Sequence, residues 1–182
     1  ATSAALNATL PSAVPIVSPK KSRKDVRKPV FHDSRLLSIP QQYQLNTWYG
    51  MKKQEWDLAY RATKHGFGGK DFHQRVDGRG PTITVIKTQE GYIFGGFLLP
   101  DWSSTNSWIR APSADAAWLF SLFNPEMEKS GNSSPVRLSC IDSSKAAFGG
   151  QFYGPIFGAG NDIFCSNMSN ENKNSNTNLG KS

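Results

Sequence analysis

The residues of this chain that could take part in a reaction are two cysteines, a few histidines and two glycine-rich turns. Cys140 and Cys165 do not form a C-x-x-C pair, so their spacing matches neither a zinc site nor a dithiol redox motif. Cys140 lies in a stretch that reads as a strand, where a thiol usually serves as packing. We interpret both cysteines as small buried side chains, with direct thiol redox chemistry as the alternative.

The histidines do not have the spacing of a metal site. His65 and His73 are eight residues apart, whereas the zinc-binding motif H-E-x-x-H places its histidines one helical turn apart, and no zinc-finger pattern is present. The sequence also lacks G-x-S-x-G, the motif of a serine nucleophile on a tight turn. We therefore predict no catalytic residue, no cofactor and no metal.

Two glycine-rich segments invite comparison with phosphate-binding loops. The first, HGFGGKD at His65–Asp71, precedes a predicted helix, where backbone N–H groups could bind a phosphate. It departs from G-x-x-x-x-G-K-[ST], because Asp71 follows Lys70 where a hydroxyl is required. The second, GAGND at Gly158–Asp162, is too short for G-x-G-x-x-G. Both are better interpreted as turns.

Positive charge is concentrated near the beginning of the sequence. The 182 residues carry a formal net charge of +7, and seven basic residues outnumber two acidic ones between Lys20 and Arg35. The residues before them are rich in Ala, Ser, Thr and Pro, so little apolar surface is available to offset the entropy of ordering. We predict that residues 1–35 are a disordered basic tail or linker. The alternatives for such a tail are binding to nucleic acid or anionic lipid, and a role in targeting.

The hydropathy of the chain contains no membrane-spanning pattern. No apolar run approaches the ~20 residues that a spanning helix needs, and no signal-like apolar segment opens the sequence. Together with two isolated cysteines, this favours a reducing, cytoplasmic setting, with organellar targeting as the alternative.

Two short helices and a strand are expected in the region from residue 36 onward. Pro40–Gly50 predicts a helix with proline in its first turn and a left-handed glycine cap. Apolar and polar residues alternate over Trp56–Ala62, the pattern of a half-buried strand. Lys70–Val76 predicts a short helix whose Phe72 and Val76 point inward together.

A hairpin and several further strands are expected after these helices. Thr82–Lys87 and Tyr92–Leu99 are rich in β-branched and aromatic residues, with a turn signal between them. Further strands are predicted at Trp118–Phe123, Val136–Ile141 and Asp162–Ser166, and the Asn- and Ser-rich end is predicted to be a surface loop. Short strands separated by turns predict a β-sandwich with few helices.

An ordered series of short motifs runs through the same region. The series is Trp56-x-Leu58-x-Tyr60-x-Ala62, His65-Gly66-Phe67, Phe72-His73, Gly80-Pro81-Thr82, Gly91-Tyr92-x-Phe94-Gly95-Gly96, Trp102, Leu119-Phe120-Ser121-Leu122, Gly154-Pro155-x-Phe157-Gly158, Asp162-Ile163 and Asn178-Leu179-Gly180. Each motif alone is common, but in this order the chain resembles the TLDc domain, the module at the carboxyl end of oxidation-resistance proteins.

The resemblance implies a fold and a function. The fold would be mainly β with short helices, a TLDc-type β-sandwich of two antiparallel sheets flanked by short helices. Family members continue past the segment that matches Asn178–Gly180, so residues 36–182 would be a TLDc-like domain lacking its final strands. The family protects cells against oxidative damage, and several members bind the vacuolar proton-pumping ATPase. The resemblance thus implies a non-enzymatic interaction domain whose partners are vacuolar ATPase subunits, which would bring it to endolysosomal membranes.

Partner-binding residues are expected on exposed loops of the sandwich, because loops on a rigid scaffold usually carry binding. We place them in two loops, His65–Lys70 and Gly154–Asp162. The candidates are His65, Gly66, Phe67, Lys70, Gly154, Pro155, Phe157 and Asp162. Two alternatives stay open: a redox-active or enzymatic protector with an unrecognised site, and a function of the basic tail in binding nucleic acid or anionic membrane.

Overall fold

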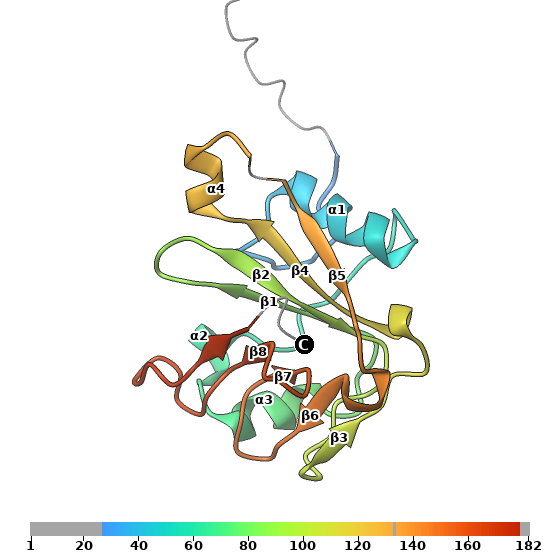
Figure 1. The fold of residues 1–182 in the computed structure, drawn as a ribbon, viewed down its shortest axis with the longest axis vertical. Helices are drawn as coiled ribbons and strands as arrows, with labels where there is room; N and C mark the ends of the chain where they lie inside the picture. The colour runs from blue at the N-terminus through green and yellow to red at the C-terminus, as the bar shows by residue number, and fades with distance from the viewer. Residues whose placement is uncertain (1–26, 133, 179–182) are drawn as a thin grey trace, which may run out of the picture.

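Two antiparallel β-sheets form the body of the chain, with short helices around them (Figure 1). The computed structural model describes residues 27–132 and 134–178, so most of the predicted tail lies outside the described residues. The elements are α1 (Ile39–Tyr49), α2 (Ala62–His65), α3 (Gly69–Val76), β1 (Thr82–Lys87), β2 (Ile93–Leu98), β3 (Ser107–Ile109), the 3-10 helix η1 (Ala114–Ala116), β4 (Ala117–Phe123), α4 (Pro125–Lys129), β5 (Val136–Ser139), the 3-10 helix η2 (Ser143–Lys145), β6 (Ala147–Gly149), β7 (Ile156–Phe157), β8 (Ile163–Phe164) and β9 (Asn176–Thr177). The predicted sandwich-like, mainly-β fold class is confirmed.

The longer strands form a four-stranded sheet in the order β1-β2-β4-β5. The predicted hairpin is present as β1 and β2, and Gly91 adopts a φ of 98° in the turn before β2. The strands predicted near Trp118 and Val136 are β4 and β5, although β5 already ends at Ser139. Within the hairpin, the carbonyl of Thr84 lies where a Cβ on Gly95 would be, so this close approach requires glycine.

Much shorter strands form the second sheet, in the order β3-β6-β7-β8-β9. The strand predicted at Asp162–Ser166 is reduced to β8, and part of the predicted surface loop pairs with it as β9. The strands β3, β6 and β7 were not predicted. Elements of two or three residues are too short to show an alternating pattern, which explains why they escape sequence analysis.

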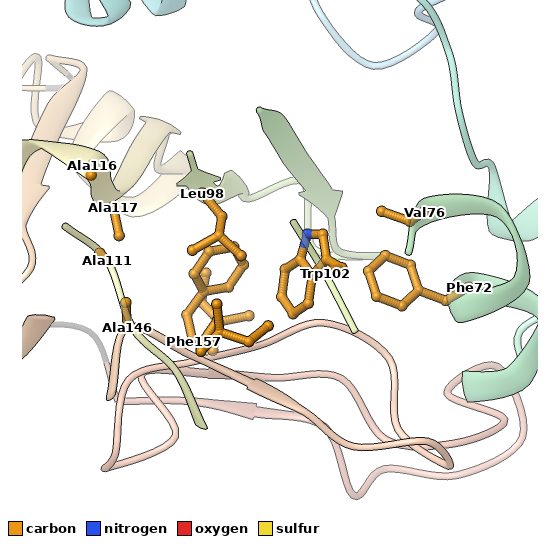
Figure 2. Packing of buried hydrophobic residues seen from close by; sticks show 12 residues of the cluster. Phe72, Val76, Leu98, Trp102, Ala111, Ala116, Ala117, Ala146 and Phe157 are labelled. Carbon is orange, nitrogen blue, oxygen red and sulfur yellow. The ribbon is translucent and has the colours of Figure 1, made fainter. Parts of the chain in front are cut away.

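Side chains from both sheets meet in a core that α3 closes on one side (Figure 2). Trp102 lies edge-on to Phe72 of α3 and to Phe157 of β7, with ring centroids 5.3 and 5.4 Å apart. Its indole Nε1 donates a hydrogen bond of 2.9 Å to Oγ1 of Thr82, which satisfies the one polar group of the ring. Val76 is buried beside Phe72, as predicted from their spacing.

The outer face of the four-stranded sheet is covered by α1, the predicted helix. Trp48 packs edge-on against Trp118 of β4 at 6.1 Å, and Phe97 of β2 stacks on Trp118 at 5.0 Å. Leu45 is fully buried in the same cluster. The helix ends at Gly50, which has the predicted left-handed conformation with φ of 90°.

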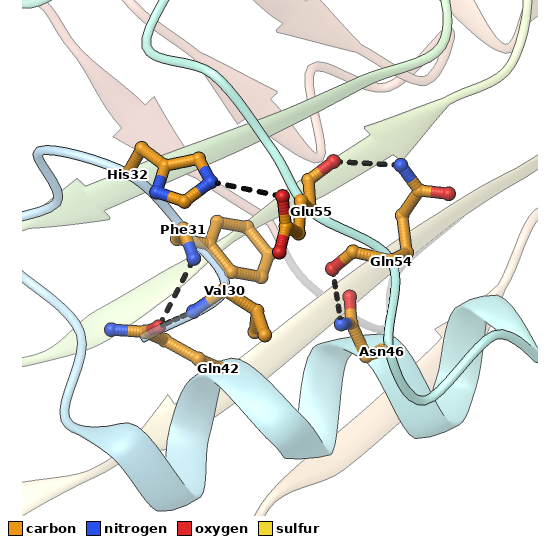
Figure 3. A network of polar contacts seen from close by, with 7 residues as sticks. All are labelled: Val30, Phe31, His32, Gln42, Asn46, Gln54 and Glu55. Carbon is orange, nitrogen blue, oxygen red and sulfur yellow. Dashed lines mark hydrogen bonds and ion pairs between the residues drawn. The ribbon is translucent and has the colours of Figure 1, made fainter. Parts of the chain in front are cut away.

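Buried amides of α1 hold the segments before and after it (Figure 3). Gln42 Oε1 accepts hydrogen bonds from the main-chain N–H groups of Val30 and Phe31 at 2.8 and 3.1 Å. Asn46 Nδ2 donates to the carbonyl of Gln54 at 2.7 Å. Because buried polar groups are nearly always paired, these bonds fix both segments against the helix.

The folded body begins earlier than the boundary predicted at residue 36. Val30 and Phe31 are both buried and belong to the cluster that contains Leu45. The prediction failed here because it followed charge and proline content, whereas two apolar side chains are enough to anchor the segment. The remainder of the predicted tail is not tested by the described residues.

The strand predicted over Trp56–Ala62 is wrong. Trp56 makes a single parallel bridge to Phe31, and the chain then runs without strand pairing to α2. Trp56 is held by its side chain: its Nε1 donates to Asn46 Oδ1 at 2.8 Å, and its ring lies 5.1 Å from that of Tyr49. The alternating residues thus have different environments rather than a ladder of strand hydrogen bonds: Trp56 packs against α1, Tyr60 packs against Phe72 of α3, and Leu58 is exposed.

Candidate interaction surface

The two loops predicted to bind a partner lie in one region of the molecule. The main-chain N–H of Met168 donates to the carbonyl of Phe67 at 3.1 Å. The N–H of Gly69 donates to Oδ1 of Asn167 at 2.9 Å, across a sequence separation of 98 residues. The first loop is therefore bonded directly to the segment that follows β8.

The segment HGFGGKD folds as a hydrogen-bonded turn. Tyr60 Oη donates to the carbonyl of Gly66 at 2.6 Å, and Asp71 Oδ2 accepts from the N–H of Gly68 at 3.0 Å. Gly66 has a φ of 101° and lies against the carboxylate of Asp71, so a side chain there would be strained and obstructed. The interpretation of this segment as a turn agrees with these bonds.

Gly69 brings the first loop into direct contact with residues 152 and 153, which come just before the second loop. A Cβ at this position would overlap the main chain of Phe152 and Tyr153. Because Gly69 is the first residue of α3, alanine would otherwise suit it well. The glycine is thus explained by the close approach of the main chain at Phe152 and Tyr153.

Large apolar side chains surround the junction of the loops. Phe152 and Tyr153 are 53% and 42% exposed, and Met168 is also exposed. Lys70 Nζ lies 5.3 Å from the centroid of the Phe152 ring. We call the side chains of Phe67, Lys70, Phe152, Tyr153 and Met168 the joined-loop surface.

Five of the eight predicted residues lie at or beside this junction. They are His65, Gly66, Phe67 and Lys70 in the first loop and Gly154, whose N–H donates to the carbonyl of Cys165 at 3.0 Å. For these residues the assignment to partner binding stays a proposal.

Burial corrects the prediction for the other three residues. Phe157, only 1% exposed, faces the core from β7, Pro155 is buried just before that strand, and the Asp162 carboxylate is tucked against Gly158. Their side chains are not available for direct contact with a partner. Phe152, Tyr153 and Met168 were not predicted to bind a partner. Two adjacent aromatic residues in a glycine-rich loop could have indicated an exposed contact site.

A row of apolar side chains extends from the junction across the second sheet. The register places Trp108, Phe148, Ile156 and Phe164 opposite one another on successive strands, so they share one face. Trp108 and Phe148 are in edge contact at 5.1 Å, and Tyr153 lies 5.6 Å from Phe164. We call the three aromatic members, Trp108, Phe148 and Phe164, the aromatic row; Ile156 lies between Phe148 and Phe164 and is buried, and Tyr153 connects the row to the joined-loop surface.

Two titratable side chains at the first loop have shifted pKa values. Partial desolvation, followed by the positive charges of Arg75, Lys64 and Arg61, lowers the pKa of His65. Burial, with smaller effects of Asp71 and Cys165, raises the pKa of Tyr60 to about 12. Tyr60 therefore remains a neutral hydrogen-bond donor at physiological pH.

The two thiols are in environments that oppose ionisation. Burial raises the pKa of Cys165 to about 12. Burial and the carboxylates of Asp142 and Asp162 also raise the pKa of Cys140. Since the thiolate is the reactive form, both side chains are poor nucleophiles at neutral pH.

His73 connects α3 to the loop between β6 and β7. It is buried, with Nδ1 2.6 Å from Oδ1 of Asp77 and Nε2 3.1 Å from the carbonyl oxygen of Gly150. Both ring nitrogens are thus engaged within the protein. Within residues 27–132 and 134–178, no three His, Cys, Asp or Glu side chains gather as metal ligands.

A hollow of about 400 Å³ lies on another part of the molecule, beside the end of α1. It is lined by Trp48, Tyr49, Phe97, Leu99, Asp115, Trp118 and Arg137. Arg137 donates to Asp115 at 2.6 Å and lies over the ring of Trp118 at 5.3 Å. Because its charged groups already bind each other, this hollow gives no ligand assignment, and it is separate from the predicted loops.

The fold and the joined-loop surface together define a β-sandwich module with an exposed contact face. A family model for the TLDc domain matches residues 30–181, beginning at the buried Val30. The chain therefore belongs to the TLDc domain family, which is associated with resistance to oxidative stress. Comparison with curated proteins gave no match. Of the helices within the described part of the chain, none has the length and apolar character to cross a membrane.

Proposed function

We propose that this chain is a non-enzymatic interaction domain that contributes to oxidative-stress protection by binding subunits of the vacuolar proton-pumping ATPase. The TLDc resemblance implies the partner. The observation that supports binding is the joined-loop surface, where Phe152 and Tyr153 stay largely exposed on a hydrogen-bonded frame. Exposed aromatic side chains on a fixed backbone are common anchors of protein interfaces.

The thiol environments favour this proposal over a redox-active protector. A redox-sensing cysteine needs an accessible thiolate, whereas burial raises the pKa of both Cys140 and Cys165. A function of the basic tail concerns residues 1–35, of which the structure describes only 27–35, and no observation on those residues favours it.

The test is a pull-down of vacuolar ATPase subunits from cell lysate with the 182-residue chain. The double substitution Phe152→Ala and Tyr153→Ala should reduce capture by at least ~10-fold, since each interface anchor typically contributes ~1–2 kcal/mol or more. Met51→Ala is the matched control, because Met51 is 56% exposed but lies at the end of α1.

Circular dichroism should show the same fold and melting temperature for all three proteins. Capture that persists in the double variant would rule out the joined-loop surface as the binding site. Capture that is absent in the unsubstituted chain would rule out the proposed partner, and loss of peroxide resistance on Cys140→Ser would favour the redox alternative.

A further inference from the structure

Three cationic side chains border the joined-loop surface. Lys64 of α2 and Arg75 of α3 are exposed, and Lys70 lies over the ring of Phe152 at the start of α3. Lys64 and Arg75 are close enough to His65 for their charges to act on its ring. None of the three takes part in an ion pair within the described residues. We call Lys64, Lys70 and Arg75 the basic border.

The carboxylates of α3 and of the residue after it are used inside the protein, whereas Glu171, in the turn that contains Met168, is exposed beside the equally exposed Lys173. Asp71 accepts the hydrogen bond from the N–H of Gly68, and Asp77 binds the ring of the buried His73. Both acidic groups of the α3 region are therefore occupied locally, whereas its cations reach solvent. The contact face that results is aromatic, and its α2–α3 side is positively charged.

We propose that the joined-loop surface and the basic border together bind an acidic protein segment that carries bulky apolar side chains. The inference rests on the proposed interaction function and specifies the chemistry of its partner. Apolar side chains of the segment would pack on Phe152 and Tyr153, while its carboxylates would face Lys64, Lys70 and Arg75. Complementary charge around an apolar centre provides register and fast association.

The packing of the aromatic rings favours a protein segment over a lipid surface. Tyr153 lies against Phe164 at 5.6 Å, and Lys70 lies over the ring of Phe152. Aromatic residues that anchor proteins to membranes insert their rings among the lipids. Rings that rest on neighbouring side chains instead present a surface on which other side chains can pack.

The test is a selection of random short peptides displayed on phage, with the complete chain as bait. Peptides enriched by the unsubstituted protein should combine Asp or Glu with Leu, Phe or Trp. A synthetic copy of an enriched peptide should bind the triple variant Lys64→Glu, Lys70→Glu, Arg75→Glu at least ~10-fold more weakly, as measured by fluorescence polarisation. Lys53→Glu, an exposed charge reversal after α1, should leave the affinity unchanged.

The outcomes separate this inference from the proposed function. Enriched peptides that need Phe152 but carry no acidic residue would overturn the acidic partner and leave an interaction surface in place. Failure to enrich any peptide whose binding is lost in Phe152→Ala would overturn the acidic-segment inference, whereas the proposed function is decided separately by the pull-down of ATPase subunits. Vesicles containing phosphatidylserine serve as a second probe: binding that needs Phe152, without peptide enrichment, would overturn the inference in favour of a membrane.

Discussion

The outer faces of the two sheets both carry aromatic side chains, but the two faces are covered to different extents. On the four-stranded sheet, Phe97 and Trp118 lie beneath α1 and are almost completely buried. On the five-stranded sheet, the aromatic row ends in Trp108, which is 39% exposed. In Figure 1, α1 lies along the first sheet, whereas the second sheet forms the opposite side of the molecule.

The difference separates stability from recognition. Buried aromatic side chains contribute large apolar areas to folding, and α1 is the element that supplies this burial on the first sheet. The second sheet packs its inner face on the core around Trp102 and Phe157, and on its outer face Trp108 is exposed while Phe148 and Phe164 are half-buried. Substitutions on the covered face should therefore lower the stability of the fold, whereas substitutions on the other face should mainly weaken binding.

The largest expected effect is on the covered face. Trp118→Ala should lower the free energy of unfolding by roughly 3–5 kcal/mol, because it removes a buried ring packed against Trp48 and Phe97. Trp108→Ala, the matched change on the uncovered face, should lower it by less than ~1 kcal/mol. Urea denaturation followed by circular dichroism measures both. Equal losses would show that the two faces are equally buried in solution.

A smaller loss of stability should follow when the hydrogen bonds that hold α1 to the following segment are removed. Asn46→Leu leaves the indole N–H of Trp56 and the carbonyl of Gln54 without their partner. An unsatisfied buried polar group destabilises by ~1–3 kcal/mol, so unfolding should require correspondingly less urea. Gln44→Leu on the same helix, at a partly exposed position, is the control and should be nearly neutral. A similar loss in both variants would mean that leucine disturbs α1 itself.

Much of the covered region could be predicted from sequence, because its elements are long. The helix before Gly50 and the β1–β2 hairpin have enough residues to show their caps, turns and residue preferences. The Trp56 segment misled the prediction, since Trp56 packs on Tyr49 and Tyr60 packs on Phe72, contacts with two different helices that only the folded chain creates. The brief strands of the second sheet had no readable pattern.

The candidate surface was predicted only in outline. Glycine spacing located the loop at Gly66–Gly69, because unusual backbone conformations leave a mark on sequence. The same reasoning placed Phe157 on the surface, although it faces the core. The contact between Gly69 and Phe152 joins residues far apart in the chain. A local sequence pattern cannot predict such a long-range contact.

The smallest predicted effect concerns how the stability of the first loop depends on pH. In this loop Tyr60 is bonded to Gly66. The pKa of Tyr60 is raised from 10.0 to about 12 in the folded protein. The unfolded chain therefore loses this proton first, so the contribution of Tyr60 to stability is complete below pH 10 and disappears as the pH rises through 12. Tyr60→Phe removes the hydrogen bond to Gly66 and should lower the free energy of unfolding by about 1 kcal/mol at pH 8.

The unsubstituted protein and the Tyr60→Phe variant should become more similar in their free energy of unfolding at alkaline pH. The reason is that only the unsubstituted protein loses stability when this hydroxyl ionises. Cys165, whose pKa is also raised to about 12, contributes alkaline destabilisation to both proteins, and its charge acts on Tyr60, so the comparison is repeated in a Cys165→Ser background. Urea titrations at a series of pH values above neutrality measure the gap. A gap that stays constant would show that Tyr60 ionises alike in the folded and unfolded chain. The loop at Gly66 would then be held by Asp71 and Asn167 without help from the phenol.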